Sequence, residues 1–181
     1  TSFTNVTKNV DLGVKGVNNQ STILSYGDSV NNTLDDTQKL TLSNVTNEAK
    51  VTVTGANAVE TLSIVSTGSA NKADIGGTAL AGTTKIVVTG DQNLSFDDTN
   101  GASAMIAVKT LDSSAFTANL DADLRSSNTN LTVTLGTGDD KLTVTNLNKD
   151  DSINMGEGSD LLTVRIADAV TNTTSIALAG V

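Results

Sequence analysis

Residues 131–145 read Leu-Thr-Val-Thr-Leu-Gly-Thr-Gly-Asp-Asp-Lys-Leu-Thr-Val-Thr. On either side of the glycines, Leu or Val alternates with Thr, which places apolar side chains on one face of a strand and hydroxyls on the other. Gly136, Gly138 and the acids beside them are residue types typical of a turn. This stretch therefore predicts a half-buried strand, a tight turn and a second half-buried strand.

The same alternation recurs along most of the chain. It is clear at residues 40–42, 51–54 and 62–64, where Leu, Val or Ile again alternates with Thr or Ser. The runs at residues 85–89 and 161–166 are more continuously apolar, so we expect them to lie deeper in the core. Short strands are thus the expected building unit throughout.

Apolar anchor residues also recur at a fixed interval of 11 positions. Strands at such a spacing, with turn residues in the gaps, indicate a sandwich, a barrel or a solenoid. One segment, residues 114–124, fits either a short helix or a turn followed by a strand. The anchors are Leu40, Val51 and Leu62; Ile75 and Ile86; Leu94, Met105 and Phe116; and Leu131, Leu142 and Ile153.

The composition agrees with a β protein and excludes several functions. The 181 residues include 29 Thr, 19 Asn and 17 Asp but only 3 Glu, and no Cys, His, Pro or Trp. Asp and Asn favour turns and Thr favours strands. Without Cys or His, disulfides, ordinary zinc sites and histidine-based catalysis are excluded. The net charge of −9 makes nucleic acid an improbable partner.

The chain shows no apolar run long enough to span a membrane and no basic-then-apolar signal at its start, so we expect it not to cross a membrane. The absence of Pro removes a common protection of sheet edges. Edges must therefore be covered by charged side chains or by neighbouring domains.

Two segments, residues 135–144 and 155–164, share the pattern apolar-Gly-x-Gly-x-Asp-x-Leu-Thr-Val. Glycine permits positive φ angles that turn backbone carbonyls inward, and Asp adds a short carboxylate. Such oxygens are the ligands of a hard cation such as Ca²⁺. Residues 139–160 hold five Asp and one Glu against two Lys, an excess that a cation would offset. The alternative is that these are ordinary solvated hairpin turns.

The pattern resembles the glycine- and aspartate-rich nonapeptide of RTX proteins, with the first Gly replaced by Leu135 or Met155. Residues 146–153 resemble a degenerate third copy. Residues 108–120 and 131–136 look like the β repeats of bacterial RTX-type surface-layer proteins. The resemblance implies Ca²⁺ as the cofactor. The metal-facing residues would be Gly136, Gly138, Asp139, Asp140, Asp151, Gly156, Gly158 and Asp160.

The resemblance also implies a fold and a location. We expect an all-β chain of short strands stacked as a β-solenoid or β-roll, with a β-sandwich-like N-terminal part as an option. Residues 1–127 would form an irregular β-repeat region, on which an RTX-like calcium-binding region, residues 128–181, stacks continuously. Secretion by a type I system to the bacterial cell surface is implied, as is self-association into a lattice.

Three functions follow as hypotheses. The first is a structural module of a self-assembling surface layer, and the second is a calcium-binding module of a large secreted adhesin, for which a cell-surface glycan is a candidate ligand. The third, a polysaccharide-active enzyme on a β-helix, is the weakest, because sugar clefts usually present aromatic platforms and this chain has one Tyr and three Phe. We therefore expect no enzymatic activity.

Overall fold

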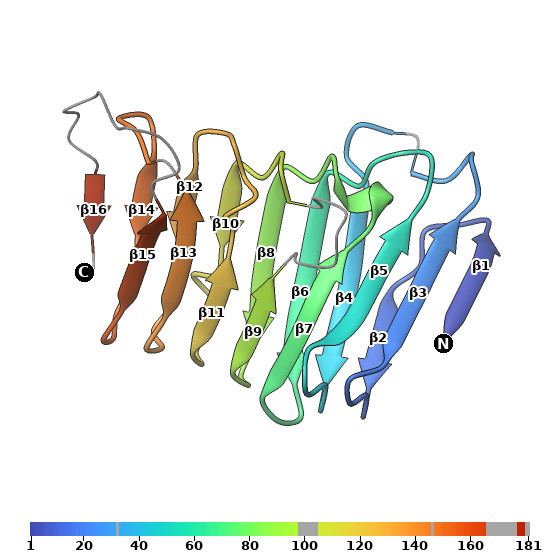
Figure 1. The fold of residues 1–181 in the computed structure, drawn as a ribbon, viewed down its shortest axis with the longest axis horizontal. Coiled ribbons are helices and arrows are strands. Elements are labelled where there is room, and N and C mark those ends of the chain that lie inside the picture. Colours follow the sequence, from blue (N-terminus) through green and yellow to red (C-terminus); the bar gives the residue numbers. More distant parts are fainter. Residues whose placement is uncertain (32, 98–104, 146, 166–176, 180–181) are drawn as a thin grey trace.

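The computed structural model describes residues 1–31, 33–97, 105–145, 147–165 and 177–179. Within them the chain forms two parallel β-sheets of eight strands each (Figure 1). Sheet A holds β1 (Ser2–Val6), β3 (Ser21–Tyr26), β5 (Ala49–Thr54), β7 (Asn71–Gly76), β9 (Leu94–Asp97), β11 (Leu120–Asp123), β13 (Lys141–Thr145) and β15 (Leu161–Arg165). Sheet B holds β2 (Leu12–Lys15), β4 (Thr37–Ser43), β6 (Thr61–Thr67), β8 (Lys85–Gly90), β10 (Thr110–Asp112), β12 (Thr132–Thr134), β14 (Ser152–Asn154) and β16 (Ala177–Ala179).

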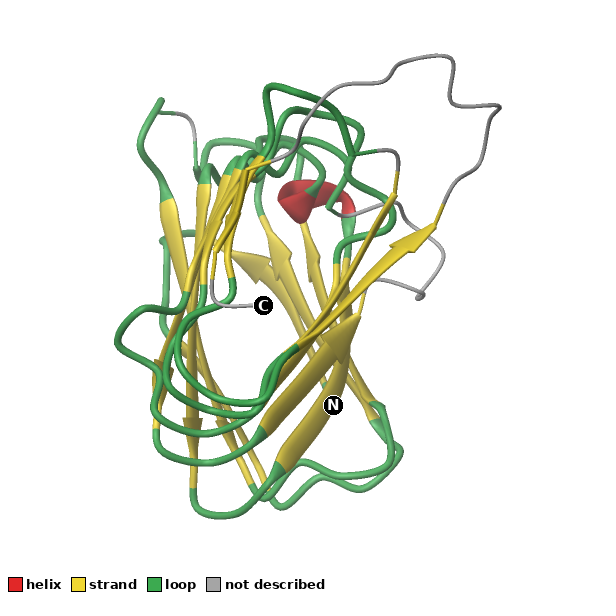
Figure 2. Ribbon diagram, turned by 90° about the vertical axis from the view of Figure 1, so that its left-hand side faces the viewer, coloured by secondary structure: helices red, strands yellow, loops and turns green. Residues whose placement is uncertain are grey.

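Consecutive strands alternate between the two sheets, and neighbours within a sheet are one full coil apart along the chain. This is a β-solenoid, so the expected stacking of short strands is confirmed. The optional β-sandwich at the N-terminal end is wrong, because β1 to β7 belong to the same two parallel sheets as the rest. Figure 2 shows the two sheets facing each other when the molecule is viewed from its end.

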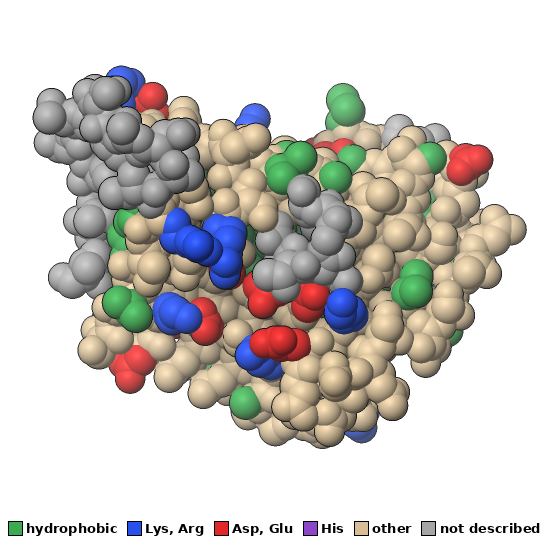
Figure 3. All heavy atoms as spheres, in the orientation of Figure 1, with side chains coloured by type: hydrophobic (Ala, Val, Ile, Leu, Met, Phe, Trp, Pro, Cys, Tyr) green, Lys and Arg blue, Asp and Glu red, His purple; other side chains and the backbone are tan. Residues whose placement is uncertain are grey.

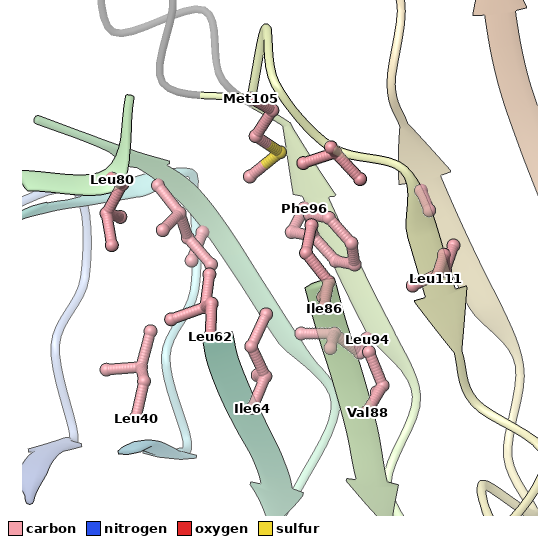
Figure 4. Close-up of a cluster of buried hydrophobic side chains, with 14 of the residues drawn as sticks. Leu40, Leu62, Ile64, Leu80, Ile86, Val88, Leu94, Phe96, Met105 and Leu111 are labelled. Atoms are coloured by element: carbon pink, nitrogen blue, oxygen red, sulfur yellow. The ribbon is translucent and has the colours of Figure 1, made fainter. Parts of the chain in front are cut away.

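The winding explains the 11-residue spacing where the apolar anchors lie in strands; Met105 and Phe116 are buried but lie in turns outside the strands. Leu40 lies in sheet B, Val51 in sheet A and Leu62 in sheet B again, so a step of 11 residues carries the chain from one sheet to the other. All three side chains are at most 1% exposed. Figure 4 shows how side chains from successive coils, such as Ile86 and Phe96, meet in one continuous core. Burial of this repeated apolar face stabilises each coil against its neighbours.

The coils shorten toward the C-terminal end. Thr37 pairs with Thr61 and Thr61 with Lys85, so each of these coils takes 24 residues. From Thr132 to Ser152 a coil takes only 20. The sheets run through residue 128 without a break, because β10 pairs with β12 and β11 with β13. A 20-residue coil places the two Gly-x-Gly-x-Asp copies directly one above the other.

Two local features were not fixed by the sequence pattern. Residues 114–124 form no helix, and β11 occupies the end of that segment. The structure instead has a short 3₁₀ helix, Thr78–Leu80, in the described part of the chain (red in Figure 2). It follows Gly77, whose φ of +124° is accessible mainly to glycine.

Asn71 is a buried polar residue at the inward-facing start of β7, where it is 3% exposed. Its side-chain oxygen accepts a 2.8 Å bond from the Val45 N–H, and its side-chain nitrogen donates to Ser66 Oγ at 2.8 Å and to Thr67 O at 3.1 Å. Because its hydrogen-bonding groups are used, Asn71 ties the turn before β5 to the turn before β7.

No helix among the described residues is long and apolar enough to cross a membrane.

Candidate metal centre

The two Gly-x-Gly-x-Asp turns stack on the same rim of the solenoid. The first turn leads into β13 and the second into β15, and their hydrogen bonds link equivalent positions. Asp140 N–H donates to Asp160 Oδ1 at 2.9 Å, and Ser159 N–H donates to Asp139 Oδ1 at 2.9 Å. Glu157 N–H donates to Gly136 O at 3.0 Å. The duplicated sequence is therefore a duplicated structure, held in register by side-chain and backbone oxygens.

Glycine is required in both turns because the backbones approach closely. A methyl group on Gly156 would lie 2.0 Å from Gly136 O, and one on Gly158 would lie 2.2 Å from Gly138 O. Gly156 and Gly158 also have positive φ angles of 89° and 129°. Gly136 and Gly138 do not, so in the first copy only the close approach of the preceding coil demands glycine. The expectation of positive φ thus holds for the second copy alone.

Asp140 and Asp160 occupy the inward-facing position immediately before β13 and β15. In the preceding coils of sheet A the same column holds Leu94 and Leu120. The chain therefore replaces two core leucines by two stacked carboxylates. Asp140 is only 2% exposed. A buried carboxylate is unfavourable unless hydrogen bonds or an opposite charge compensate it.

Hydrogen bonds compensate only one of the two oxygen atoms of each carboxylate. Asp140 Oδ1 accepts a 2.8 Å bond from the Leu120 N–H, and Asp160 Oδ1 accepts the bond from Asp140 N–H. The second oxygen, Oδ2, of each is buried and finds no hydrogen-bond partner among the described residues. Unsatisfied buried polar atoms are rare in native proteins and call for an explanation such as a bound ion.

The pKa of Asp140 also indicates that the negative charge of its carboxylate is only partly compensated. Burial, together with the negative charges of Asp160 and Asp139, raises the pKa of Asp140 from 3.8 to about 6. Backbone N–H groups of Leu120 and Gly136 oppose this shift without cancelling it. The ionised form of Asp140 is therefore disfavoured in the ion-free protein.

Asp139 has a different environment, on the exposed outer edge of the turn. Its own N–H donates to Asn119 Oδ1 at 3.1 Å, and the Asn119 N–H donates to Asn93 Oδ1 at 3.1 Å. Asn93, Asn119 and Asp139 thus form a ladder along the rim in which each side chain accepts from the next coil. Sequence reasoning missed this ladder, although Asn at positions 93 and 119 precedes β9 and β11 as Asp139 and Asp140 precede β13.

Asp151 is not brought together with the other predicted ligands. It lies half a coil away from Asp140, in the turn between β13 and β14 on the opposite rim. Both of its oxygens are used, since Oδ1 accepts from the Leu131 N–H and Oδ2 from the Asn148 N–H, each at 2.6 Å. The bond from Asn148 closes the turn that contains Asp151, and the bond from Leu131 attaches this turn to the backbone of the preceding coil.

The donor set at the glycine turns limits which ion could bind there. In the described ranges, no three His, Cys, Asp or Glu side chains converge on one point. A cation between the turns would therefore be held by Asp140 and Asp160 together with backbone carbonyls of the two glycine turns. A set made only of oxygen atoms suits Ca²⁺, which accepts carboxylates, carbonyls and water.

Charged side chains also gather on one broad face of the molecule (Figure 3). On the outer surface of sheet A, Lys72 pairs with Glu48 at 2.5 Å and Lys141 pairs with Asp121 at 3.2 Å. A hollow of about 350 Å³ on this surface is lined by Asn, Ser, Lys and Asp side chains together with Val45, Leu94 and Leu120, and by no aromatic ring. Exposed pairs of this kind contribute little to stability, and the hollow presents no stacking platform for a sugar.

Comparison with protein-family models, with curated protein sequences and with solved structures finds no match to this chain.

Proposed function

We propose that this chain is a calcium-stabilised structural module of a secreted bacterial surface protein, which self-associates into a surface layer and has no enzymatic activity. The observation that carries the proposal is the stacked pair Asp140 and Asp160. Both lie in the column of sheet A that holds Leu94 and Leu120 in the two coils before Asp140, and each has one buried oxygen without a partner among the described residues.

Calcium is favoured by the chemistry of this pair. Two carboxylates one coil apart repel each other, and a divalent cation between them would supply the missing partner of both Oδ2 atoms. The backbone carbonyls of the glycine turns would complete an oxygen-only shell. The positive charge of the cation would also favour the ionised form of Asp140 and so oppose the rise in its pKa that burial causes.

The strength expected of such a site suits a protein that orders outside the cell. Extracellular calcium modules bind with dissociation constants of about 10⁻⁴ to 10⁻³ M. At millimolar calcium, a site of about 10⁻⁴ M stabilises the fold by roughly 1.4 kcal/mol, and at submicromolar calcium it contributes almost nothing. The last coils would therefore be less stable inside the cell and more stable after export.

A structural role is favoured over catalysis by the repetitive surface. Outward-facing positions of sheet B are mostly short Thr, Ser and Val side chains, repeated in register from strand to strand. The chain holds neither His nor Cys. A repeated surface of this kind is suited to contacts with repeated partners such as copies of the same protein.

Calorimetric calcium titration of Asp140→Asn, Asp160→Asn and Asp151→Asn tests the proposal. We expect the unchanged protein to release or absorb heat on binding calcium, and the first two variants to lose this heat of binding. Asp151→Asn is the matched control, because it removes a buried acid of the same size on the opposite rim and should bind calcium as before. No calcium heat from the unchanged protein, or equal heat from all three variants, would reject the calcium site.

A further inference from the structure

The hollow of about 350 Å³ on the outer surface of sheet A runs along the rim that carries the glycine turns, and we call it the rim groove. Its lining begins in the turn before β5 and ends in β13. From β7 to β13, each coil contributes one residue of the rim and one outward-facing residue of its strand. These pairs are Ala70 and Lys72, Asn93 and Ser95, Asn119 and Asp121, and Asp139 and Lys141. The rim groove therefore crosses the strands of sheet A, and all of its lining residues belong to the described part of the chain.

Two asparagines present side-chain N–H groups at the edge of the rim groove. Asn93 Oδ1 accepts from the Asn119 N–H, and Asn119 Oδ1 accepts from the Asp139 N–H, each at 3.1 Å. Because only the oxygen of an amide can accept these bonds, the orientation of both side chains is fixed. Neither Nδ2 has a hydrogen-bond partner among the residues that the structure describes. The rim thus holds two amide donors, one coil apart, that are free to bond a ligand.

The charges around the rim groove are balanced. Its lining holds two lysines, Lys72 and Lys141. It also holds two aspartates, Asp121 and Asp139, so the net charge of the lining is zero. Lys141 pairs with Asp121 at 3.2 Å and Lys72 with Glu48 at 2.5 Å, and all four side chains are about half exposed. Each ammonium group has three donors, so the pairing leaves donors for a ligand. A lining without net charge does not select a polyanion such as nucleic acid.

Aliphatic side chains complete the lining. Val45, Leu94 and Leu120 contribute to it, and it has no aromatic ring. In the outward-facing row, Ser95 stands between Lys72 and Asp121, and its short side chain leaves room between them. A ligand with both apolar faces and many hydroxyls would use the aliphatic and the polar parts of this lining together.

We propose that the rim groove binds a short segment of an uncharged linear glycan. Sugar hydroxyls both donate and accept hydrogen bonds, which matches amide and ammonium donors beside carboxylate acceptors. Neighbouring coils are about 4.8 Å apart, and a sugar ring has a similar length along its chain, so successive rings can meet successive coils. The volume lies at the lower end of the range of about 300–1,000 Å³ that is usual for ligand sites. This inference goes beyond the proposed function and requires neither calcium nor self-association.

An extended peptide fits the rim groove less well. Peptides that bind to sheets usually add a strand to a free edge and bond its backbone. The strands β7, β9 and β11 each pair with a neighbour on both sides, so they offer no free backbone edge here. Recognition in the rim groove must therefore use side chains, and the test has to separate a glycan from a peptide.

Nuclear magnetic resonance titration of the ¹⁵N-labelled chain tests the proposal. The probes are three neutral trisaccharides: maltotriose, cellotriose and triacetylchitotriose. We expect at least one to shift the side-chain amide signals of Asn93 and Asn119, with a dissociation constant of about 10⁻³ M because no ring stacks on the sugar. The amide signal of Asn154 should not move, since Asn154 accepts a bond from the Gly156 N–H on the other sheet. No shift at Asn93 and Asn119 with any probe, or an equal shift at Asn154, would overturn the proposal.

Two variants locate the binding. Asn119→Asp keeps an oxygen that can accept the Asp139 N–H bond but removes the Nδ2 donor, so we expect binding about fivefold weaker or less. Ser95→Ile fills the rim groove with a residue that suits a strand, and it should abolish the shifts. Asn154→Asp is the matched control and should bind as the unchanged protein does. Unchanged affinity in Asn119→Asp or in Ser95→Ile would overturn the assignment of the site.

Two further probes define the class of ligand. A hexapeptide of Gly, Ser and Thr should bind more weakly than the best trisaccharide, and trigalacturonate, an acidic trisaccharide, should bind no more tightly than the neutral ones. Tighter binding of the hexapeptide at Asn93 and Asn119 would show a peptide site and overturn the proposal. Binding of trigalacturonate at least about tenfold tighter than that of every neutral probe would show that the rim groove selects negative charge, and it would overturn the proposal as well.

Discussion

Replacing Asp140 by Asn should stabilise the calcium-free protein at neutral pH. The pKa of Asp140 rises from 3.8 to about 6 on folding because the carboxyl is buried beside Asp160. The folded state therefore binds a proton more tightly than the unfolded state, and ionising Asp140 above pH 6 costs about 3 kcal/mol of stability. Asn keeps an oxygen that can accept the Leu120 N–H bond but carries no charge. We expect Asp140→Asn to be about 2 to 3 kcal/mol more stable than the unchanged protein at pH 7.5 in chelator.

The sign of the pH dependence provides a second readout. Because the folded-state pKa of Asp140 is raised, the calcium-free protein should gain stability as the pH falls through 6 toward 3.8, by about 2 kcal/mol between pH 7.5 and 4.5. The pKa values of Asp112 and Asp123 are lowered by their hydrogen bonds to Ser114 and Arg125, although burial opposes this at both sites. They stay ionised across this range, and their contribution is lost only at lower pH.

Urea unfolding followed by circular dichroism at pH 7.5 and 4.5, always in chelator, measures both effects. The unchanged protein should become more stable at the lower pH, and Asp140→Asn should show a much smaller change. Asp151→Asn is the control, and it should retain the pH dependence of the unchanged protein. Identical pH slopes for all three proteins, or a loss of stability on acidification to pH 4.5, would refute the reasoning about the buried pair.

Three further predictions concern the fold itself. Gly156→Ala should destabilise the protein by at least about 2 kcal/mol in thermal unfolding, because the added methyl group would clash with the backbone and the residue has a positive φ. Gly13→Ala is the control and should cost less than about 1 kcal/mol, because no atom lies within 4 Å of the added methyl group. Asn71→Ala should cost about 2 to 4 kcal/mol in urea unfolding, since it leaves buried partners unsatisfied; a neutral result would mean that water replaces the side chain. Phe96→Ala should cost about 3 to 5 kcal/mol and Phe3→Ala less than about 1 kcal/mol in dilute solution, and equal losses would contradict the assigned core.

Stacked short strands could be predicted from the sequence because the apolar residues of the core recur at a regular spacing. Apolar anchors 11 residues apart, such as Leu40, Val51 and Leu62, must alternate between two sheets once the chain winds with a coil of about twice that length. The spacing could not exclude a sandwich, since antiparallel strands can recur at the same interval. Parallel pairing became visible only when the register of the strands was known.

The candidate site was predicted in part for a similar reason. The 20-residue separation of Asp140 and Asp160 equals one coil, so their stacking follows from the duplicated turn. The resemblance of residues 146–153 to a degenerate third copy of the turn groups Asp151 with them, but a residue half a coil away lies on the opposite rim. The Asn ladder could not be found from the sequence, because Asn93 and Asn119 are 26 residues apart and only the three-dimensional register makes them neighbours.

The position of a bound ion is the measurement that tests the central claim most directly. Crystals of the protein grown with calcium, and then with terbium in its place, should give an anomalous difference peak between the two glycine turns. We expect this peak about 2.3–2.6 Å from the carboxylate oxygens of Asp140 and Asp160 when calcium is bound. Crystals at millimolar calcium with no peak there, and with both Oδ2 atoms still without a partner, would contradict the account.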